Sequence, residues 1–105
     1  MPTFGETIAE ARKRAGLTQK DLAAKLKKDD GTSISAQYLN DIEHDRRGAP
    51  PDALLKQLSR ILELNPDLLA YLAGRLLESL VDHRADPGQV VDAFRAFRRK
   101  MGKGG

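Results

Sequence analysis

The chain has 105 residues, 40% hydrophobic and 31% charged, which is the composition of a single globular domain. It contains no cysteine, and this excludes disulfide frameworks, thiolate metal sites and cysteine nucleophiles. The net charge is +3, and the last eleven residues are basic without any acid, which favours an anionic partner.

The residue types present predict an all-α fold. Leu, Ala, Arg, Lys and the acidic residues dominate, whereas β-branched and aromatic residues are few. No apolar stretch is long enough to cross a bilayer, and the first residues lack the layout of a signal peptide. We therefore expect a cytoplasmic protein that does not contact membranes.

Two short helices are predicted at the N-terminal end. The first extends from about Thr3 to Ala15, with apolar residues three and four apart, and Gly16 provides a left-handed stop. Thr18 caps the second helix, with Asp21 three residues later as in a capping box. The inner face of this second helix consists of Leu22, Ala23 and Leu26.

A third helix is separated from the second by a polar segment. Residues Lys27 to Ser33 are polar and helix-breaking, and they are predicted to form a loop. The third helix should begin after Ser35, a favourable N-cap, and end near His44. Its apolar residues Leu39 and Ile42 are expected in the core.

Proline marks the start of each later helix. Pro50-Pro51-Asp52 opens a fourth helix and Asn65-Pro66-Asp67 a fifth, which we expect to break at Gly74. A sixth apolar stripe covers residues 75–84, and Asp86-Pro87 opens the last helix. We divide the chain into a domain of residues 1–74 and a helical extension of residues 75–105 that ends in a basic, flexible tail.

Two ordered motifs resemble the lambda-repressor-like (Xre-type) helix-turn-helix family. The first is the run from Arg12 to Ala23, RKRAGLTQKDLA, and the second is the run from Ile34 to Glu43, ISAQYLNDIE, followed by Arg46-Arg47 and Pro50. The resemblance covers roughly residues 4 to 73. It implies a domain of five short helices, with the second and third reading DNA, and a dimeric bacterial or phage transcription regulator.

The third helix carries the candidate base contacts. Short polar side chains on a helix in the major groove can hydrogen-bond base edges. Gln37 is the best base reader, because its amide can bond adenine in bidentate fashion. The carboxylate of Asp41 is repelled by DNA unless it accepts from a cytosine amino group or pairs with a neighbouring arginine. The candidate base-contacting residues are Ala36, Gln37, Asn40 and Asp41.

Phosphate contacts are expected around these two helices. The start of the second helix places its positive dipole end and the Gln19 amide where they can hold a phosphate. The hydroxyl of Tyr38 can reach a phosphate, or its ring can pack on Ile34. The candidate phosphate-contacting residues are Thr18, Gln19, Lys20, Tyr38, His44, Arg46 and Arg47.

Two further features come from comparison with the family pattern. The resemblance implies a partly buried ion pair between Arg12 and Glu43, which would orient the third helix. Residues Lys27 to Thr32 look inserted, because the usual turn between the two DNA-reading helices is about six residues shorter. The insert is either a passive surface loop or an element whose Lys27 and Lys28 touch the DNA backbone.

The last helix carries a narrow apolar stripe at spacings of four, three and four, formed by Val90, Phe94, Phe97 and Met101. Such a stripe packs helix against helix, and we expect it to contribute to a dimer interface. The alternative is that the helix folds back on its own domain, against Leu76, Leu80 and Val81.

The sequence therefore predicts a sequence-specific DNA-binding repressor that binds a palindromic operator in double-stranded DNA as a homodimer. Two alternatives are an antitoxin or immunity-type regulator whose C-terminal helices bind a protein partner, and an interaction adaptor that reads no bases. We expect no enzymatic activity, metal or cofactor. His44 and His83 have no companions at metal-ligand spacing, and there is no phosphate-cradling glycine loop.

Overall fold

The computed structural model describes residues 1–74 and 87–102, and within these ranges it contains six α-helices and no strand. The helices are α1 (Phe4–Arg14), α2 (Gln19–Lys25), α3 (Ala36–Glu43), α4 (Asp52–Leu62), α5 (Pro66–Leu72) and α7 (Pro87–Gly102). The prediction of an all-α fold is confirmed. The sixth helix predicted over residues 75–84 lies outside the described residues, as does the basic tail of residues 103–105.

The predicted helix starts are confirmed in detail. Thr18 forms the predicted capping box with Asp21, and Thr3 forms a second one with Glu6 that was not predicted. The side chain of Ser35 accepts a hydrogen bond from the N–H of Tyr38 at the start of α3. Asn65 caps α5 ahead of Pro66, as its sequence context predicts. These caps satisfy amides that otherwise have no partner in the first helical turn.

The predicted helix ends are confirmed as well. Gly16 and Gly74 both adopt positive φ, +74° and +73°, directly after α1 and α5. An L side chain rarely adopts this conformation, so the chain leaves the helical path at these positions. The break at Gly74 closes the five-helix cluster.

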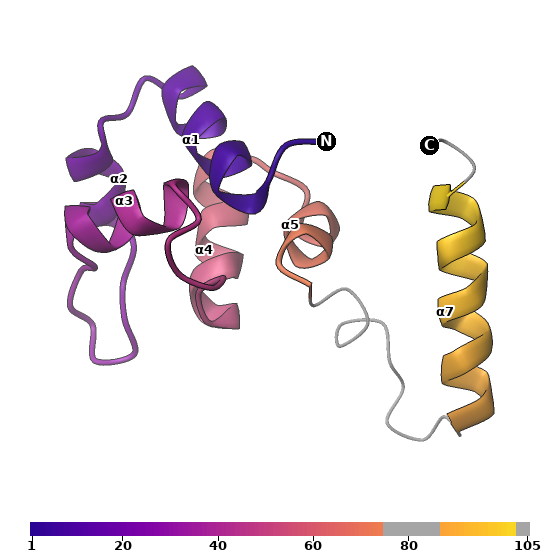
Figure 1. Ribbon diagram of the computed structural model, residues 1–105. Coiled ribbons are helices and arrows are strands. Elements are labelled where there is room, and N and C mark those ends of the chain that lie inside the picture. Colours follow the sequence, from indigo (N-terminus) through magenta and orange to yellow (C-terminus); the bar gives the residue numbers. More distant parts are fainter. Residues whose placement is uncertain (75–86, 103–105) are drawn as a thin grey trace.

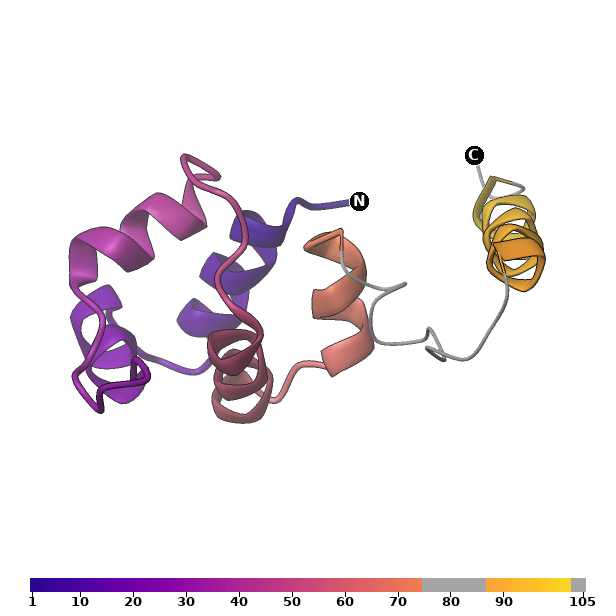
Figure 2. The same cartoon turned by 90° about the horizontal axis from the view of Figure 1, so that it is seen from below.

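The five helices α1 to α5 enclose one aliphatic core (Figure 1 and Figure 2). α3 packs against both α1 and α2, while α4 packs against α1 and α5. Ala23 is 2% exposed, and this small residue allows α2 and α3 to approach each other. The side chains most fully buried are Ile8, Leu22, Leu26, Leu39, Leu58 and Leu69.

A close contact joins the start of α1 to the end of α3. The carboxylate of Asp45, directly after α3, accepts from the Thr3 hydroxyl (2.5 Å) and from the Gly5 N–H (3.0 Å). A Cβ on Gly5 would lie 2.4 Å from the carbonyl oxygen of Ile42 and 2.6 Å from that of Glu43. Only glycine allows α1 to approach α3 this closely.

The polar segment between α2 and α3 is a hydrogen-bonded hairpin. Lys27 and Ser33 form an antiparallel β-bridge, and the Lys28 N–H donates to the Thr32 carbonyl (2.8 Å). At the turn, the Asp30 carboxylate accepts from the Thr32 N–H (2.9 Å) and hydroxyl (2.6 Å). The segment is non-helical as predicted. The predicted loop is closed by backbone pairing, which polar composition does not reveal, and we call it the hairpin (residues 27–33).

α7 is set apart from the five-helix cluster, on the side of α5 (Figure 1), and an aromatic pair among the described residues joins these two helices. The ring centroids of Tyr71 and Phe97 lie 5.5 Å apart. Val90 and Phe97 are half-buried, whereas Phe94 is 41% exposed. The side chain of Met101 and the predicted fold-back partners Leu76, Leu80 and Val81 lie outside the described residues. Within residues 1–74 and 87–102, no helix combines the length and the apolarity needed to span a membrane.

Candidate nucleic-acid interface

α3 presents a polar face on the side opposite the core. Leu39 and Ile42 are buried, while Ala36 and Gln37 on the first turn are exposed. Asn40 and Asp41 are half-buried on the next turn. The four candidate base-contacting residues therefore lie along one side of the helix, and we call this side the reading face.

A buried ion pair holds α3 against α1. Arg12 Nε donates to Glu43 Oε2 (2.7 Å) and Arg12 Nη2 to Glu43 Oε1 (3.1 Å), in bidentate geometry. The side chains are 11% and 3% exposed. A third Arg12 donor, Nη1, bonds the carbonyl of Leu17 (2.9 Å), at the entry to α2. One guanidinium thus links α1, the start of α2 and the end of α3.

The ion pair continues into a hydrogen-bond chain that reaches the reading face. Gln19 Nε2 donates to Glu43 Oε1 (2.9 Å), and Asn40 Nδ2 donates to Gln19 Oε1 (3.3 Å). The half-buried Gln19 amide, predicted as a phosphate clamp, is therefore engaged between α2 and α3. In this structure its side chain sets the position of Asn40.

Arg46 folds over the reading face from the segment after α3. Its Nη1 donates to Asn40 Oδ1 (3.0 Å) and lies 3.5 Å from Asp41 Oδ1. The same Asp41 oxygen accepts from Gln37 Nε2 (3.0 Å). Asp41 is therefore neutralised by a neighbouring arginine, one of the two conditions under which a carboxylate is tolerated beside DNA. Arg46, predicted as a phosphate contact, lies among the candidate base contacts.

The remaining candidates surround this face. Thr18 and Lys20 are exposed at the start of α2. The backbone N–H of Thr18, and to a smaller extent its hydroxyl, hydrogen-bond the carboxylate of Asp21 and lower its pKa. His44 is exposed at the end of α3, with Nδ1 2.9 Å from the Asn40 carbonyl oxygen.

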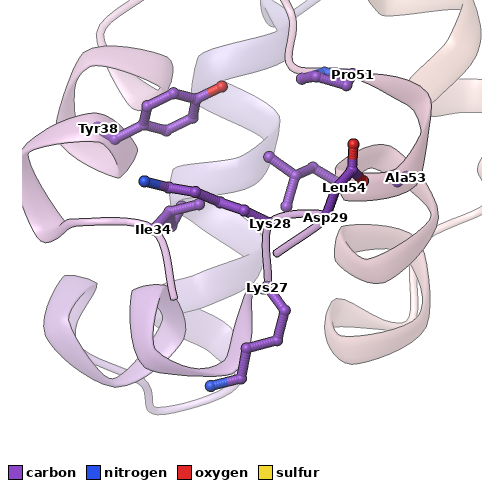
Figure 3. A pocket seen from close by; sticks show the side chains of 8 residues that line it. All are labelled: Lys27, Lys28, Asp29, Ile34, Tyr38, Pro51, Ala53 and Leu54. Atoms are coloured by element: carbon purple, nitrogen blue, oxygen red, sulfur yellow. The ribbon is translucent and has the colours of Figure 1, made fainter. Parts of the chain in front are cut away.

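The flank of α3 that faces α4 carries a stacked cation. The Arg47 guanidinium carbon lies 4.3 Å from the centroid of the half-buried Tyr38 ring, a cation–π contact. Tyr38 also lines a pocket of about 240 Å³ between the hairpin, α3 and α4 (Figure 3). Ile34 lines the same pocket, so the structure supports packing of Tyr38 beside Ile34, with the hydroxyl directed toward Pro51.

Sequence reasoning missed two residues that position the site. Asp45 ties the end of α3 to the start of α1, and Gln57 of α4 bonds the backbone of Lys27 at both its N–H (2.8 Å) and its carbonyl (2.9 Å). Neither residue lies in a recognisable pattern, because the partners are thirty or more residues away in sequence. Within the described ranges, no three acidic or histidine side chains gather in a way that could hold a metal ion.

The chain is similar to known regulators over most of its length. A family model described as helix-turn-helix matches residues 8–69. The chain is 37% identical over 73 residues to the HTH-type transcriptional regulator ImmR and 32% identical over 78 residues to the HTH-type transcriptional repressor RghR, both of Bacillus subtilis (strain 168). These matches cover 70% and 74% of this chain.

A third relative extends the match toward the C-terminus. The uncharacterized HTH-type transcriptional regulator RghRB of Bacillus subtilis (strain 168) is 26% identical over 98 residues, 93% of this chain. The chain spans 50% to 61% of the length of these three relatives. No solved structure matches significantly.

Proposed function

This chain belongs to the helix-turn-helix family of DNA-binding transcriptional regulators, and we propose that it is a repressor that binds a palindromic operator as a homodimer. It is a regulator rather than an enzyme. The observation that carries the proposal is the reading face of α3, on which amide, carboxylate and guanidinium groups are held in one network.

Direct readout of bases is supported by the chemistry of this face. Gln37 is exposed and bonds only a neighbouring carboxylate among the described residues, so its amide can exchange that bond for an adenine edge. Asn40 and Asp41 hold the Arg46 guanidinium over the same face, where its remaining donors can meet a base or a phosphate. Phosphate contacts by Thr18, Lys20, His44 and Arg47 would set the register.

A homodimer is supported by the apolar residues that α7 leaves exposed. Val91 and Phe94 are 46% and 41% exposed, while Phe97 packs on Tyr71 of the same chain. Leu68, on α5, is also 36% exposed. In the proposed division, residues 1–74 bind DNA and residues 75–105 join two copies. The two recognition helices would then lie about 34 Å apart, one turn of DNA.

The test is selection of bound sequences from a random pool of DNA duplexes. The expected result is one enriched motif composed of two inverted half-sites whose centres are about 10 base pairs apart. An enriched motif without two-fold symmetry would overturn the proposal that a homodimer binds a palindromic operator. The absence of any enrichment, at a salt concentration where the protein binds bulk DNA, would overturn sequence-specific readout.

A further inference from the structure

The hairpin between α2 and α3 is a built element that α4 holds in place. The Gln57 side chain accepts from the Lys27 N–H (2.8 Å) and donates to the Lys27 carbonyl (2.9 Å), as a neighbouring strand would. Lys27 also faces Ser33 in the β-bridge, and the Ile34 N–H donates to the Leu26 carbonyl (3.0 Å). The base of the hairpin is therefore fixed relative to both α3 and α4.

The two lysines of the hairpin have different surroundings. Lys27 Nζ donates to the Ala24 carbonyl (3.0 Å) and to Ser33 Oγ (2.8 Å), so its ammonium is directed back toward α2. Lys28 is exposed, and no hydrogen bond or ion pair with a residue of the described ranges holds its ammonium. Figure 3 shows Lys28 extending from the hairpin toward Ile34 and Tyr38, away from the side chain of Lys27.

Lys28 and Tyr38 line the same pocket, so Lys28 lies at the flank of α3 that carries Tyr38. Successive residues of an α-helix are rotated by about 100°, so Asn40 and Tyr38 lie on opposite flanks of α3, with Gln37 between them. The Asn40 flank meets Gln19 of α2. The Tyr38 flank faces the hairpin and carries Arg47 over its ring. Lys28 and Arg47 therefore both lie near Tyr38, at the flank that α2 does not cover.

The two acidic residues at the hairpin turn have different surroundings. Asp29 lies on the side of Ala53 and Leu54 of α4 (Figure 3). The Asp30 carboxylate is bonded by the hydroxyl and N–H of Thr32, and these bonds lower its pKa, to which the nearby positive charge of Lys28 adds. It remains charged at neutral pH but is already satisfied within the turn.

We propose that the hairpin is a second DNA-backbone contact, in which the Lys28 ammonium and the Arg47 guanidinium hold phosphates along the Tyr38 flank of the recognition helix. The proposal rests on the proposed function, because it requires α3 to occupy the major groove. Lys28 would touch the DNA. Gln57 would act as a positioning residue, because its bonds to the Lys27 backbone hold the hairpin where Lys28 can reach a phosphate.

The decisive measurement is the salt dependence of binding to the selected operator and to an unrelated duplex. Each neutralised phosphate contributes about 0.9 to the slope of log K against log salt. Lys28→Gln is expected to flatten the slope by about 1 on both duplexes, without changing the selected motif. The matched control is Lys56→Gln, since Lys56 is an exposed lysine of α4 that lines a pocket facing α5. The salt slope of this variant should equal that of the wild type.

Gln57→Ala tests the positioning role. It should weaken binding in the wild-type background and have no further effect in the Lys28→Gln background, because it acts through that lysine. Equal losses in both backgrounds would overturn the positioning role of Gln57. If the wild-type protein binds DNA and Lys28→Gln leaves the salt slope unchanged, the proposed hairpin contact is overturned, while the proposed function stands. Failure of the wild-type protein to bind any duplex would instead overturn the proposed function.

Discussion

Glu43 is the residue through which α1, α2 and α3 are joined. Its two carboxylate oxygens accept from two nitrogens of Arg12 and from the amide of Gln19. The side chain is 3% exposed, so these bonds replace all of its hydration. A buried carboxylate is tolerated here only while these partners remain. Through it, α1 fixes the position of α3, the proposed recognition helix.

The Arg12–Glu43 pair is expected to stabilise the domain only as a pair. Arg12→Ala or Glu43→Ala leaves one buried charge uncompensated, which typically costs about 3–5 kcal/mol. The double variant should lose much less than the two single losses summed. Denaturant unfolding of the four proteins measures this coupling. Additive losses would show that the two charges do not depend on each other in solution.

Gln37→Ala is expected to alter specificity rather than stability. Gln37 is exposed and its one described bond is to Asp41 on the same helix, so its loss leaves the core unchanged. Loss of a bidentate base contact should cost about 1–3 kcal/mol and relax preference at one position in each half-site. Repeating the selection with the variant checks this. A motif identical to that of the wild type would show that another side chain reads this position.

The contact between α1 and α3 depends on the absence of a side chain at one position. Gly5 approaches two backbone carbonyls at the C-terminal end of α3, and its N–H donates to Asp45, which follows the same end of that helix. The Ile42 carbonyl also accepts from the Asp45 N–H (3.1 Å), so it cannot rotate away without losing that bond. The close approach in turn brings Arg12, further along α1, into reach of Glu43.

Gly5→Ala is therefore expected to destabilise the domain, although alanine favours helices more than glycine by about 1 kcal/mol. Forcing a methyl group into this contact should cost at least about 1–3 kcal/mol. The control is Gly48→Ala, because a Cβ on Gly48 meets no atom within 4 Å. Thermal unfolding should show a lower midpoint for Gly5→Ala and little change for Gly48→Ala. Equal midpoints would mean that α1 can move away from α3 at no cost.

The whole molecule combines a closed five-helix cluster with a helix that is only partly covered. α7 contributes Phe97 to a contact with Tyr71, and its neighbour Phe94 is exposed with the Arg98 guanidinium carbon 5.7 Å from its ring centroid. Burial of an exposed phenylalanine and valine in an interface would be favourable by about 25 cal/mol for each Å² removed from water. A second copy of α7 is the partner that we propose.

Phe94→Glu is expected to shift the protein from dimer to monomer, because a carboxylate cannot be buried unpaired in an apolar interface. Ala96→Glu is the matched control, since Ala96 is exposed on the other side of α7. Truncation after Arg84 should have the same effect as Phe94→Glu. Sedimentation at micromolar concentration measures the oligomeric state of these three variants and of the wild type.

Persistence of the dimer in Phe94→Glu and in the truncated protein would show that α7 does not join the two copies. A monomeric wild-type protein would contradict the homodimer, and it would favour the alternative in which the C-terminal helices bind a different protein.

The amino-acid sequence alone determined the helices and the reading face. The side chains of Thr3, Thr18, Ser35 and Asn65 bond amides two or three residues ahead, so the patterns that predict these caps are contained in short stretches. The positions of Gln37 and Asp41 on one side of α3 follow from helical periodicity in the same way.

Only the tertiary structure decided how these elements are held and where the charges lie. Asp45 bonds Gly5 forty residues away, and Gln57 bonds Lys27 thirty residues away. Arg46 lies over the reading face because its guanidinium bonds Asn40 and pairs with Asp41 there, whereas its position after α3 predicted a phosphate contact. Local propensity governs bonds that close within one helical turn. A bond between distant residues depends on packing, which brings the partners together only after the core has formed.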